Sequence, residues 1–188
     1  INELSNIIEF TKELAVIPFS IDARYGFISL TFLNTLLRKK IFNQDEYSTF
    51  LNNIPTISYL FNKNINLVSK DIKKYDNFIK MFGHLRPSTY DIESNNYSEL
   101  FKRSVFKNKT KKFITNKINL DISRNIWTRK KNEINKLLKD SNFSISHNQL
   151  YDFIVKGIQR REKGKYEYSK SVNIILKFVE KIAKLMKI

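Results

Sequence analysis

The stretch Leu150-Tyr151-Asp152-Phe153-Ile154-Val155-Lys156-Gly157-Ile158 decides the fold class, because its apolar residues return every three or four positions. This spacing is typical of one face of an α-helix. Just before it, Ser146 and Gln149 form a capping-box pattern that predicts the start of the helix. The apolar stripe resumes after a polar interval and continues to Met186. We therefore predict one long C-terminal helical segment.

The polar interval in this stripe reads Arg161-Glu162-Lys163-Gly164-Lys165-Tyr166. A glycine inside a helix costs up to about 1 kcal/mol, so either the helix breaks at Gly164 or another part of the chain approaches closely there. Arg161 and Lys165 lie about one helical turn apart. They form either a cationic patch, with Glu162 as an internal partner, or an ordinary solvated charged face.

Outward from this segment, helical spacing predicts further helices over about 4–15, 21–41, 44–51, 57–68, 71–82 and 121–139. Pro18 is expected to separate the first two, with Ser20 as the N-cap of the second. Asn43 and Glu46 form another capping-box pattern. Sustained alternation of the kind found in strands is nearly absent. The predicted fold class is all-α, an irregular multi-helix domain that spans residues 1–188 around one core, which could divide into two lobes.

The composition excludes several kinds of site. The chain has no cysteine, so disulfides and thiolate metal sites are ruled out. With only two histidines, a histidine-rich metal site is also excluded, and we predict no metal ligands. No uninterrupted apolar run approaches the length of about 18 residues needed to span a bilayer, and no signal-peptide pattern is present. We therefore expect a cytoplasmic protein without a membrane partner, and interpret the chain, which begins at Ile1, as part of a longer polypeptide.

The net charge of +16 admits a nucleic-acid-binding interpretation. Lys supplies most of the 34 basic residues, and the parallel abundance of Asn and Ile is what A/T-rich coding would produce. Arg, which binds phosphates and guanines through two parallel hydrogen bonds, is scarce. The charge is therefore weak evidence for a polyanion, and we expect no specific nucleic acid. A basic helical nucleic-acid-binding or interaction module remains the alternative function.

A basic, irregular connection is predicted over about residues 93–119, where the helical pattern is lost. Basic residues recur between Lys102 and Lys117, and no acid follows Glu99 in this stretch. Such a run is most often a solvated connection. The other interpretation is a strip that meets an acidic neighbour or a nucleotide phosphate.

The turn after the helix at 71–82 concentrates chemically distinct side chains in Gly83-His84-Leu85-Arg86-Pro87-Ser88-Thr89-Tyr90-Asp91-Ile92. Gly83 is expected to end the helix in the left-handed conformation, and Pro87 to stiffen the turn. His84 and Arg86 would then suit an anion, since Arg can hold a carboxylate or phosphate with two bonds and His titrates near neutral pH. Alternatively, both side chains tie the turn to the core through backbone carbonyls.

Two other polar residues also leave alternatives open. Asp91 is a cap, a partner of an arginine or a general base. Arg24 lies on an apolar-rich helix, so it must be paired or face a cavity, unless it sits at the edge of the apolar stripe. Walker-type loops, nucleophile elbows and zinc-ligand pairs do not occur in the sequence.

Three stretches together resemble one family. His84-Leu85-Arg86-Pro87-Ser88-Thr89-Tyr90-Asp91-Ile92 resembles the His-Leu-Arg-Pro-Gly-Thr-Tyr-Asp-Ile signature of phosphoenolpyruvate-synthase-related phosphotransferases, with Ser88 in place of Gly. Ala23-Arg24-Tyr25-Gly26-Phe27-Ile28 is similar to the family's Ala-Arg-x-Ala-Phe-Ile helix. Residues 161–170 are similar to its Arg-Glu-x-x-Lys-Phe-x-Phe-Thr-Lys/Arg helix. The group includes rifampin phosphotransferases and kinases encoded with capsule-modification genes.

The resemblance implies a kinase built from three parts: an ATP-grasp region that binds ATP and Mg²⁺, a swivelling domain with a phosphohistidine, and a central helical region that receives the acceptor. The chain resembles that central region, so by itself it should bind no cofactor and be inactive. Within the group it is most similar to the L-glutamine kinases of capsular phosphoramidate synthesis. His84 and Arg86 would be catalytic, and the substrate-binding residues would be Arg24, Thr89, Tyr90, Asp91, Arg161 and Lys165.

Overall fold

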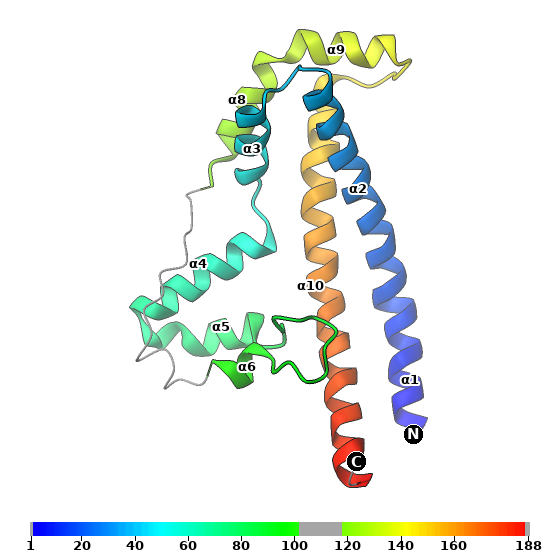
Figure 1. Ribbon diagram of the computed structural model, residues 1–188, viewed down its shortest axis with the longest axis vertical. Helices are drawn as coiled ribbons and strands as arrows, with labels where there is room; N and C mark the ends of the chain where they lie inside the picture. Colours follow the sequence, from blue (N-terminus) through cyan, green and yellow to red (C-terminus); the bar gives the residue numbers. More distant parts are fainter. Residues whose placement is uncertain (1, 102–117, 187–188) are drawn as a thin grey trace. The chain divides into compact units, whose positions relative to one another are not determined.

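The computed structural model describes residues 2–101 and 118–186, which form helices and contain no strand. The fold class is all-α, as predicted (Figure 1). In chain order the elements are α1 (Asn2–Thr11), the π-helical turn η1 (Lys12–Val16), α2 (Ile17–Arg38), α3 (Gln44–Asn52), α4 (Ile57–Lys70), the 3₁₀ turn η2 (Ile72–Lys74), α5 (Tyr75–Phe82), α6 (Tyr97–Leu100), α8 (Leu120–Arg129), α9 (Lys131–Asp140) and α10 (His147–Met186).

The predicted break at Pro18 is wrong, because α1, η1 and α2 follow one another without a gap. Proline has no N–H and clashes with the carbonyl four residues earlier in a regular helix. Here the preceding turn is π-helical, and the Ile17 N–H donates to the carbonyl of Lys12, five residues back. A wider turn of this kind accommodates a proline. Ser20 is not an N-cap; its hydroxyl donates to the Ile17 carbonyl at 2.7 Å, within the helix.

Both predicted capping boxes are confirmed. The Glu46 N–H donates to the Asn43 side chain at 2.8 Å, and Glu46 Oε2 accepts from the Asn43 N–H at 3.0 Å, at the start of α3. Ser146 and Gln149 exchange equivalent bonds at the start of α10. The helix of α10 is 40 residues long and continues through Gly164, so the helix does not break there.

The described residues form two compact units, which we call unit 1 and unit 2. Unit 1 contains Ile1–Ser20, Ser58–Thr115 and Gly164–Ile188, and unit 2 contains Ile21–Ile57 and Asn116–Lys163. The two units share α10, whose N-terminal part belongs to unit 2 and whose C-terminal part belongs to unit 1. The basic run between Lys102 and Lys117 lies outside the described residues.

Unit 2 is built around an aromatic core. Trp127 of α8 is 1% exposed and contacts three other rings, those of Phe42, Phe50 and Tyr151, with centroids 5.6–5.9 Å away. The Trp127 indole N–H donates to the His147 carbonyl at 2.9 Å. The indole therefore has its polar group satisfied, as buried tryptophans require. Aliphatic residues complete this core: Leu33, Leu36, Ile54, Ile126, Ile134, Leu138, Leu150, Ile154 and Val155.

Two glycines bring α2 and α10 close together within unit 2, where the helices run side by side (Figure 1). A Cβ on Gly26 would lie 2.6 Å from Cδ of Arg161, and a Cβ on Gly157 would lie 2.2 Å from the Ser29 hydroxyl oxygen. Ser29 is fully buried, and its hydroxyl donates to the Tyr25 carbonyl at 2.8 Å. A side chain at either glycine would force the helices apart.

Unit 1 has a separate cluster of rings on α4, α5 and α6. Phe61 contacts Phe78, Phe82 and Tyr97 with ring centroids 5.0–5.5 Å apart, and Tyr97 stacks on Phe101. The Tyr166 ring of α10 lies against Phe82, and its hydroxyl donates to the Met81 carbonyl at 2.6 Å. These contacts attach α5 to the C-terminal part of α10.

The helical stretch Glu3–Arg38 is long and apolar enough, by length and composition alone, to cross a membrane, with a mean hydropathy of 1.2 over its most apolar window. The sequence expectation counted uninterrupted apolar runs, whereas this window tolerates up to two charged residues. Core helices of soluble proteins and signal sequences satisfy the same criterion. The structure is compatible with a soluble protein, and a cytoplasmic location stays a prediction.

Candidate functional site

The turn at residues 83–92 follows α5 directly, and Gly83 begins it in an unexpected conformation. Its φ of −61° and ψ of −27° are right-handed helical, so the predicted left-handed stop is wrong. Glycine is required here for space, because a Cβ would lie 2.5 Å from the Ile79 carbonyl oxygen and 3.2 Å from Cβ of Ser98. The Gly83 carbonyl in turn accepts from the Ser98 N–H at 3.0 Å. The close approach joins the start of the turn to α6.

Arg86 holds the loop that follows the turn. Its side chain is buried, with 8% exposed, and Nη1 donates to the carbonyls of Asp91, Ile92 and Ser94. Hydrogen bonds from a charged donor are worth about 1.5–3 kcal/mol when the alternative is an unsatisfied buried group. Of the two alternatives for Arg86, this geometry favours the structural tie, since Nη1 is already occupied by the loop. The Nε atom is buried and has no partner among the described residues.

His84 lies half-buried against α10. Its ring meets the Tyr166 ring edge-on, with centroids 5.0 Å apart. Burial lowers the pKa of His84 below its usual value of 6.5, a hydrogen bond with the Tyr166 backbone opposes this shift, and Lys170 reinforces it. The balance favours the neutral form of the imidazole. Its Nε2 is buried without a partner among the described residues, and such an orphaned atom in a native fold calls for a physical explanation.

The tip of the loop exposes the remaining predicted residues. Tyr90 is 61% exposed, and its ring centroid lies 6.2 Å from that of Tyr168 on α10. Asp91 is exposed, and its Oδ1 accepts from the Glu93 N–H at 3.0 Å, so it caps the loop. Thr89 is half-buried at the tip, and Lys165 is exposed on α10. Unit 1 thus contains His84, Arg86, Thr89, Tyr90, Asp91 and Lys165.

Arg24 and Arg161 belong to unit 2. The Arg161 guanidinium lies 5.0 Å from the centroid of the Phe27 ring, a cation–π contact, while its aliphatic stem covers Gly26. Arg24 is exposed on α2, so it sits at the edge of the stripe and not in the core. The structure brings the stretch around Gly26 to Arg161, and separately brings the turn at 83–92 to Tyr166 and Tyr168.

Sequence reasoning missed the residues that support this loop. Asn96 is fully buried, caps α6 in a capping box with Glu99, and donates through Nδ2 to Asn173 Oδ1 at 3.1 Å. Glu99 also pairs with Lys177 of α10 at 3.2 Å. The spacing of Asn96 and Glu99 is the signal that could have revealed the cap. The contacts with Asn173 and Lys177 cross more than 70 residues and leave no local signal.

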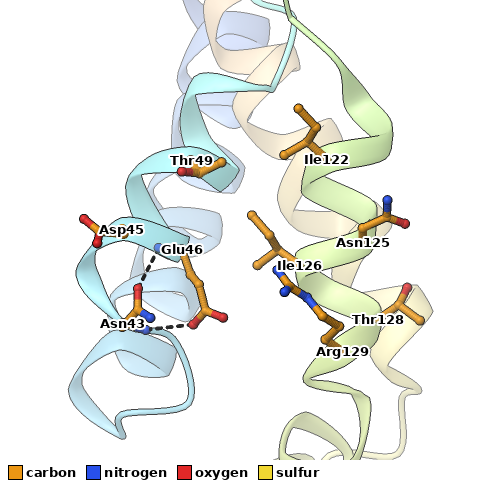
Figure 2. Close-up of a pocket in the computed structure, with 9 residues that line it drawn as sticks. All are labelled: Asn43, Asp45, Glu46, Thr49, Ile122, Asn125, Ile126, Thr128 and Arg129. Carbon is orange, nitrogen blue, oxygen red and sulfur yellow. Dashed lines mark hydrogen bonds between the residues drawn. The ribbon is translucent and has the colours of Figure 1, made fainter.

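A second feature that sequence analysis missed is a polar cleft between α3 and α8 in unit 2, with a volume of about 720 Å³ (Figure 2). Figure 2 shows Arg129 extending into the space between the two helices, whereas Asp45 points away from α8. The Glu46 carboxylate is held by the capping box and lies 3.7 Å from Lys130 Nζ. The cleft is wide open, and none of the predicted site residues lines it.

The described residues contain no group of three or more His, Asp and Glu side chains that could hold a metal ion. Comparison of the chain with protein-family models, with curated proteins and with solved structures finds no match. The family resemblance therefore rests on the motif residues alone and stays a prediction.

Proposed function

We propose that the chain is the central, acceptor-binding part of an ATP-dependent phosphotransferase that works through a phosphohistidine on a separate swivelling domain. ATP and Mg²⁺ would bind to an ATP-grasp domain of the same protein, and no described residue of this chain is assigned to them. L-Glutamine, phosphorylated for capsule modification, is the acceptor that we propose.

The observation that carries this proposal is the packing of the motif stretches. The signature at 84–92 meets the stretch at 161–170, since His84 lies against Tyr166 and Tyr90 lies near Tyr168. In unit 2, Arg161 of the same helical stretch covers Gly26, which belongs to the third motif. Each of the three family-like stretches therefore contacts another of the three, although they are far apart in the sequence.

The chemistry of the turn suits a reaction that depends on positioning. Phosphoryl transfer is catalysed mainly by orienting the reactants and stabilising charge. An imidazole with an unpaired ring nitrogen could exchange a proton with the phosphoryl acceptor; because His84 Nε2 is buried here, the proposal requires the loop to move and uncover it. The phenol of Tyr90 is exposed on the same loop, near Tyr168, and could hold a polar substrate. Arg86 would act as a positioning residue, because its Nη1 already holds the loop.

The test uses the protein with its ATP-binding and phosphohistidine domains, supplied with ATP, Mg²⁺ and L-glutamine. We expect glutamine-dependent phosphate release that His84→Ala lowers by about 10²-fold or more, the range typical of a lost acid–base group. His147→Gln, which alters the only other histidine, is the matched control and should retain activity. Robust ATP turnover by residues 1–188 alone would contradict the three-part arrangement. Submicromolar binding to a defined DNA or RNA at physiological salt would favour the alternative module.

A further inference from the structure

Unit 2 contains an apolar cavity of about 320 Å³ at the end of the unit where α2, α9 and the start of α10 meet. It is distinct from the polar cleft between α3 and α8. Its lining consists of aliphatic and aromatic side chains with three hydroxyl groups: Ile28, Thr31, Phe32, Thr35, Leu36, Ile134, Leu137, Leu138, Ser141, Phe143 and Leu150.

No lining residue carries a charge, and two of the three hydroxyls are already used. Thr31 Oγ1 donates to the Phe27 carbonyl at 2.9 Å, and Thr35 Oγ1 donates to the Thr31 carbonyl at 2.8 Å while accepting from Arg38. An ion in the cavity would lose its hydration, which costs several kcal/mol or more, and the guanidinium that contacts the lining, that of Arg38, is already hydrogen-bonded to Thr35. The cavity therefore selects against charged ligands.

The back of the cavity is fixed and its mouth is open. Leu36, Ile134 and Leu150 are at most 2% exposed and belong to the core of unit 2. Phe32 meets Phe143 edge-on, with centroids 5.7 Å apart. At the mouth, Ile28 and Phe143 are 46% and 47% exposed. A ligand could enter from solvent and then pack against side chains that are already held in place.

We infer that this cavity binds a small, uncharged, largely apolar molecule of one to three rings. Its volume lies at the lower end of the range of about 300–1,000 Å³ found for ligand sites, which limits the ligand to this size. A ligand of this kind is favoured because its binding removes its own apolar surface and that of the lining from water. The Ser141 hydroxyl, which has no partner among the described residues, is available for one hydrogen bond. The site uses none of the residues assigned to the proposed phosphotransferase function, so the two proposals can be tested independently.

The test is a fluorescence titration of the chain with N-phenyl-1-naphthylamine, a neutral probe that carries a naphthalene and a phenyl group and brightens in apolar surroundings. We expect saturable binding to one site. The affinity should not change between about 0.05 and about 0.5 M salt, because no ion pair is involved. The sulfonated analogue 8-anilinonaphthalene-1-sulfonate should fail to displace the neutral probe. Displacement by it at equal concentration would overturn the assignment to uncharged ligands.

Two variants locate the site. Thr31→Trp places a ring over the lining from an exposed position of α2 and should weaken probe binding by about tenfold or more. Thr128→Trp is the matched control, because Thr128 also bonds to its own helix, donating to the Arg124 carbonyl, but lies on α8 outside the cavity. Thr35→Phe is a second filling variant, and circular dichroism checks the fold of each. Absence of saturable binding, or equal loss in Thr31→Trp and Thr128→Trp, would overturn the inference.

Discussion

Unit 1 and unit 2 are built from the same kinds of residue but differ in what they bury. Unit 2 closes around Trp127 and its neighbouring rings, and the indole nitrogen has a partner. Unit 1 buries polar groups in its loop, and two of them, His84 Nε2 and Arg86 Nε, have no partner among the described residues. Departures from complete polar satisfaction concentrate at functional sites. The comparison shows that the polar group at the centre of the core of unit 2 has a partner, whereas the loop of unit 1 contains two buried nitrogens without one among the described residues.

The largest effect is expected in the core of unit 2. Trp127→Ala should lower the free energy of unfolding by about 3–5 kcal/mol, because it removes a buried ring and leaves a cavity among its three aromatic neighbours. Trp127→Phe keeps most of the volume, loses the hydrogen bond to the His147 carbonyl and should cost less. Since Trp127 is the only tryptophan, denaturation is followed by circular dichroism. A loss of stability below about 1 kcal/mol for Trp127→Ala would contradict the view that the core of unit 2 depends on this ring.

An intermediate effect is expected in the loop of unit 1. Arg86→Lys should lower the free energy of unfolding by about 1.5–3 kcal/mol, because an ammonium group on a flexible stem does not reproduce the planar guanidinium that spans the three carbonyls. Arg129→Lys is the control, since Arg129 is exposed and has no ion pair among the described residues. Chemical denaturation measures both. Equal stability of the two variants would show that the loop does not depend on Arg86.

The smallest expected effect is a pH dependence of the free energy of unfolding that comes from His84 in the loop of unit 1. The pKa of His84 is lowered from 6.5 in the folded state, so the unfolded chain binds the proton more readily. Stability should therefore be fully present above pH 6.5 and decline as the pH falls below it. His84→Gln should flatten this decline. The measurement is the midpoint of urea unfolding between about pH 7.5 and about pH 5.0, the interval in which histidine side chains usually titrate.

The pKa of His147 is also lowered, by burial first and by Lys131 second. His147→Gln should then remove the remaining part of the decline in stability at low pH. The two variants together distinguish the units, because His84 lies in unit 1 and His147 lies in unit 2. If His84→Gln left the slope unchanged, the imidazole of His84 would not be held in its neutral form by the fold.

Local patterns in the sequence were sufficient for the all-α fold class and for two of the capping boxes, but not for every helix boundary or cap. The capping boxes at Asn43 and Ser146 involve residues three apart, so the chain itself carries the signal. Pro18 shows the limit of such rules, because a π-helical turn beside it removes the clash that the rule assumes. Gly83 shows another limit, since the reason for glycine there is the Ile79 carbonyl oxygen and Ser98, which approach it in three dimensions.

The candidate site was predictable only as a set of residues and not as an arrangement. The likeness of residues 84–92 to a family signature pointed to His84 and Arg86, but the carbonyls that occupy Arg86 belong to the irregular segment after it. The apolar cavity in unit 2 was not predictable, because its lining comes from α2, α9 and α10 at spacings that also describe an ordinary core. Periodicity identifies a buried face but not whether the packing against it is complete.

The contact between Gly26 and Arg161 restricts which residues homologous proteins can have at position 26. A methyl group at position 26 would lie 2.7 Å from Cβ of Arg161, an atom fixed by the backbone of α10, so the two helices would have to separate. The motif that this stretch resembles has alanine at this position and keeps arginine at the facing one, so that pattern requires a wider spacing of the two helices than this chain has. In a set of homologous sequences, a residue larger than glycine at position 26 should therefore be accompanied by changes elsewhere along the contact between α2 and α10 that allow the helices to lie further apart.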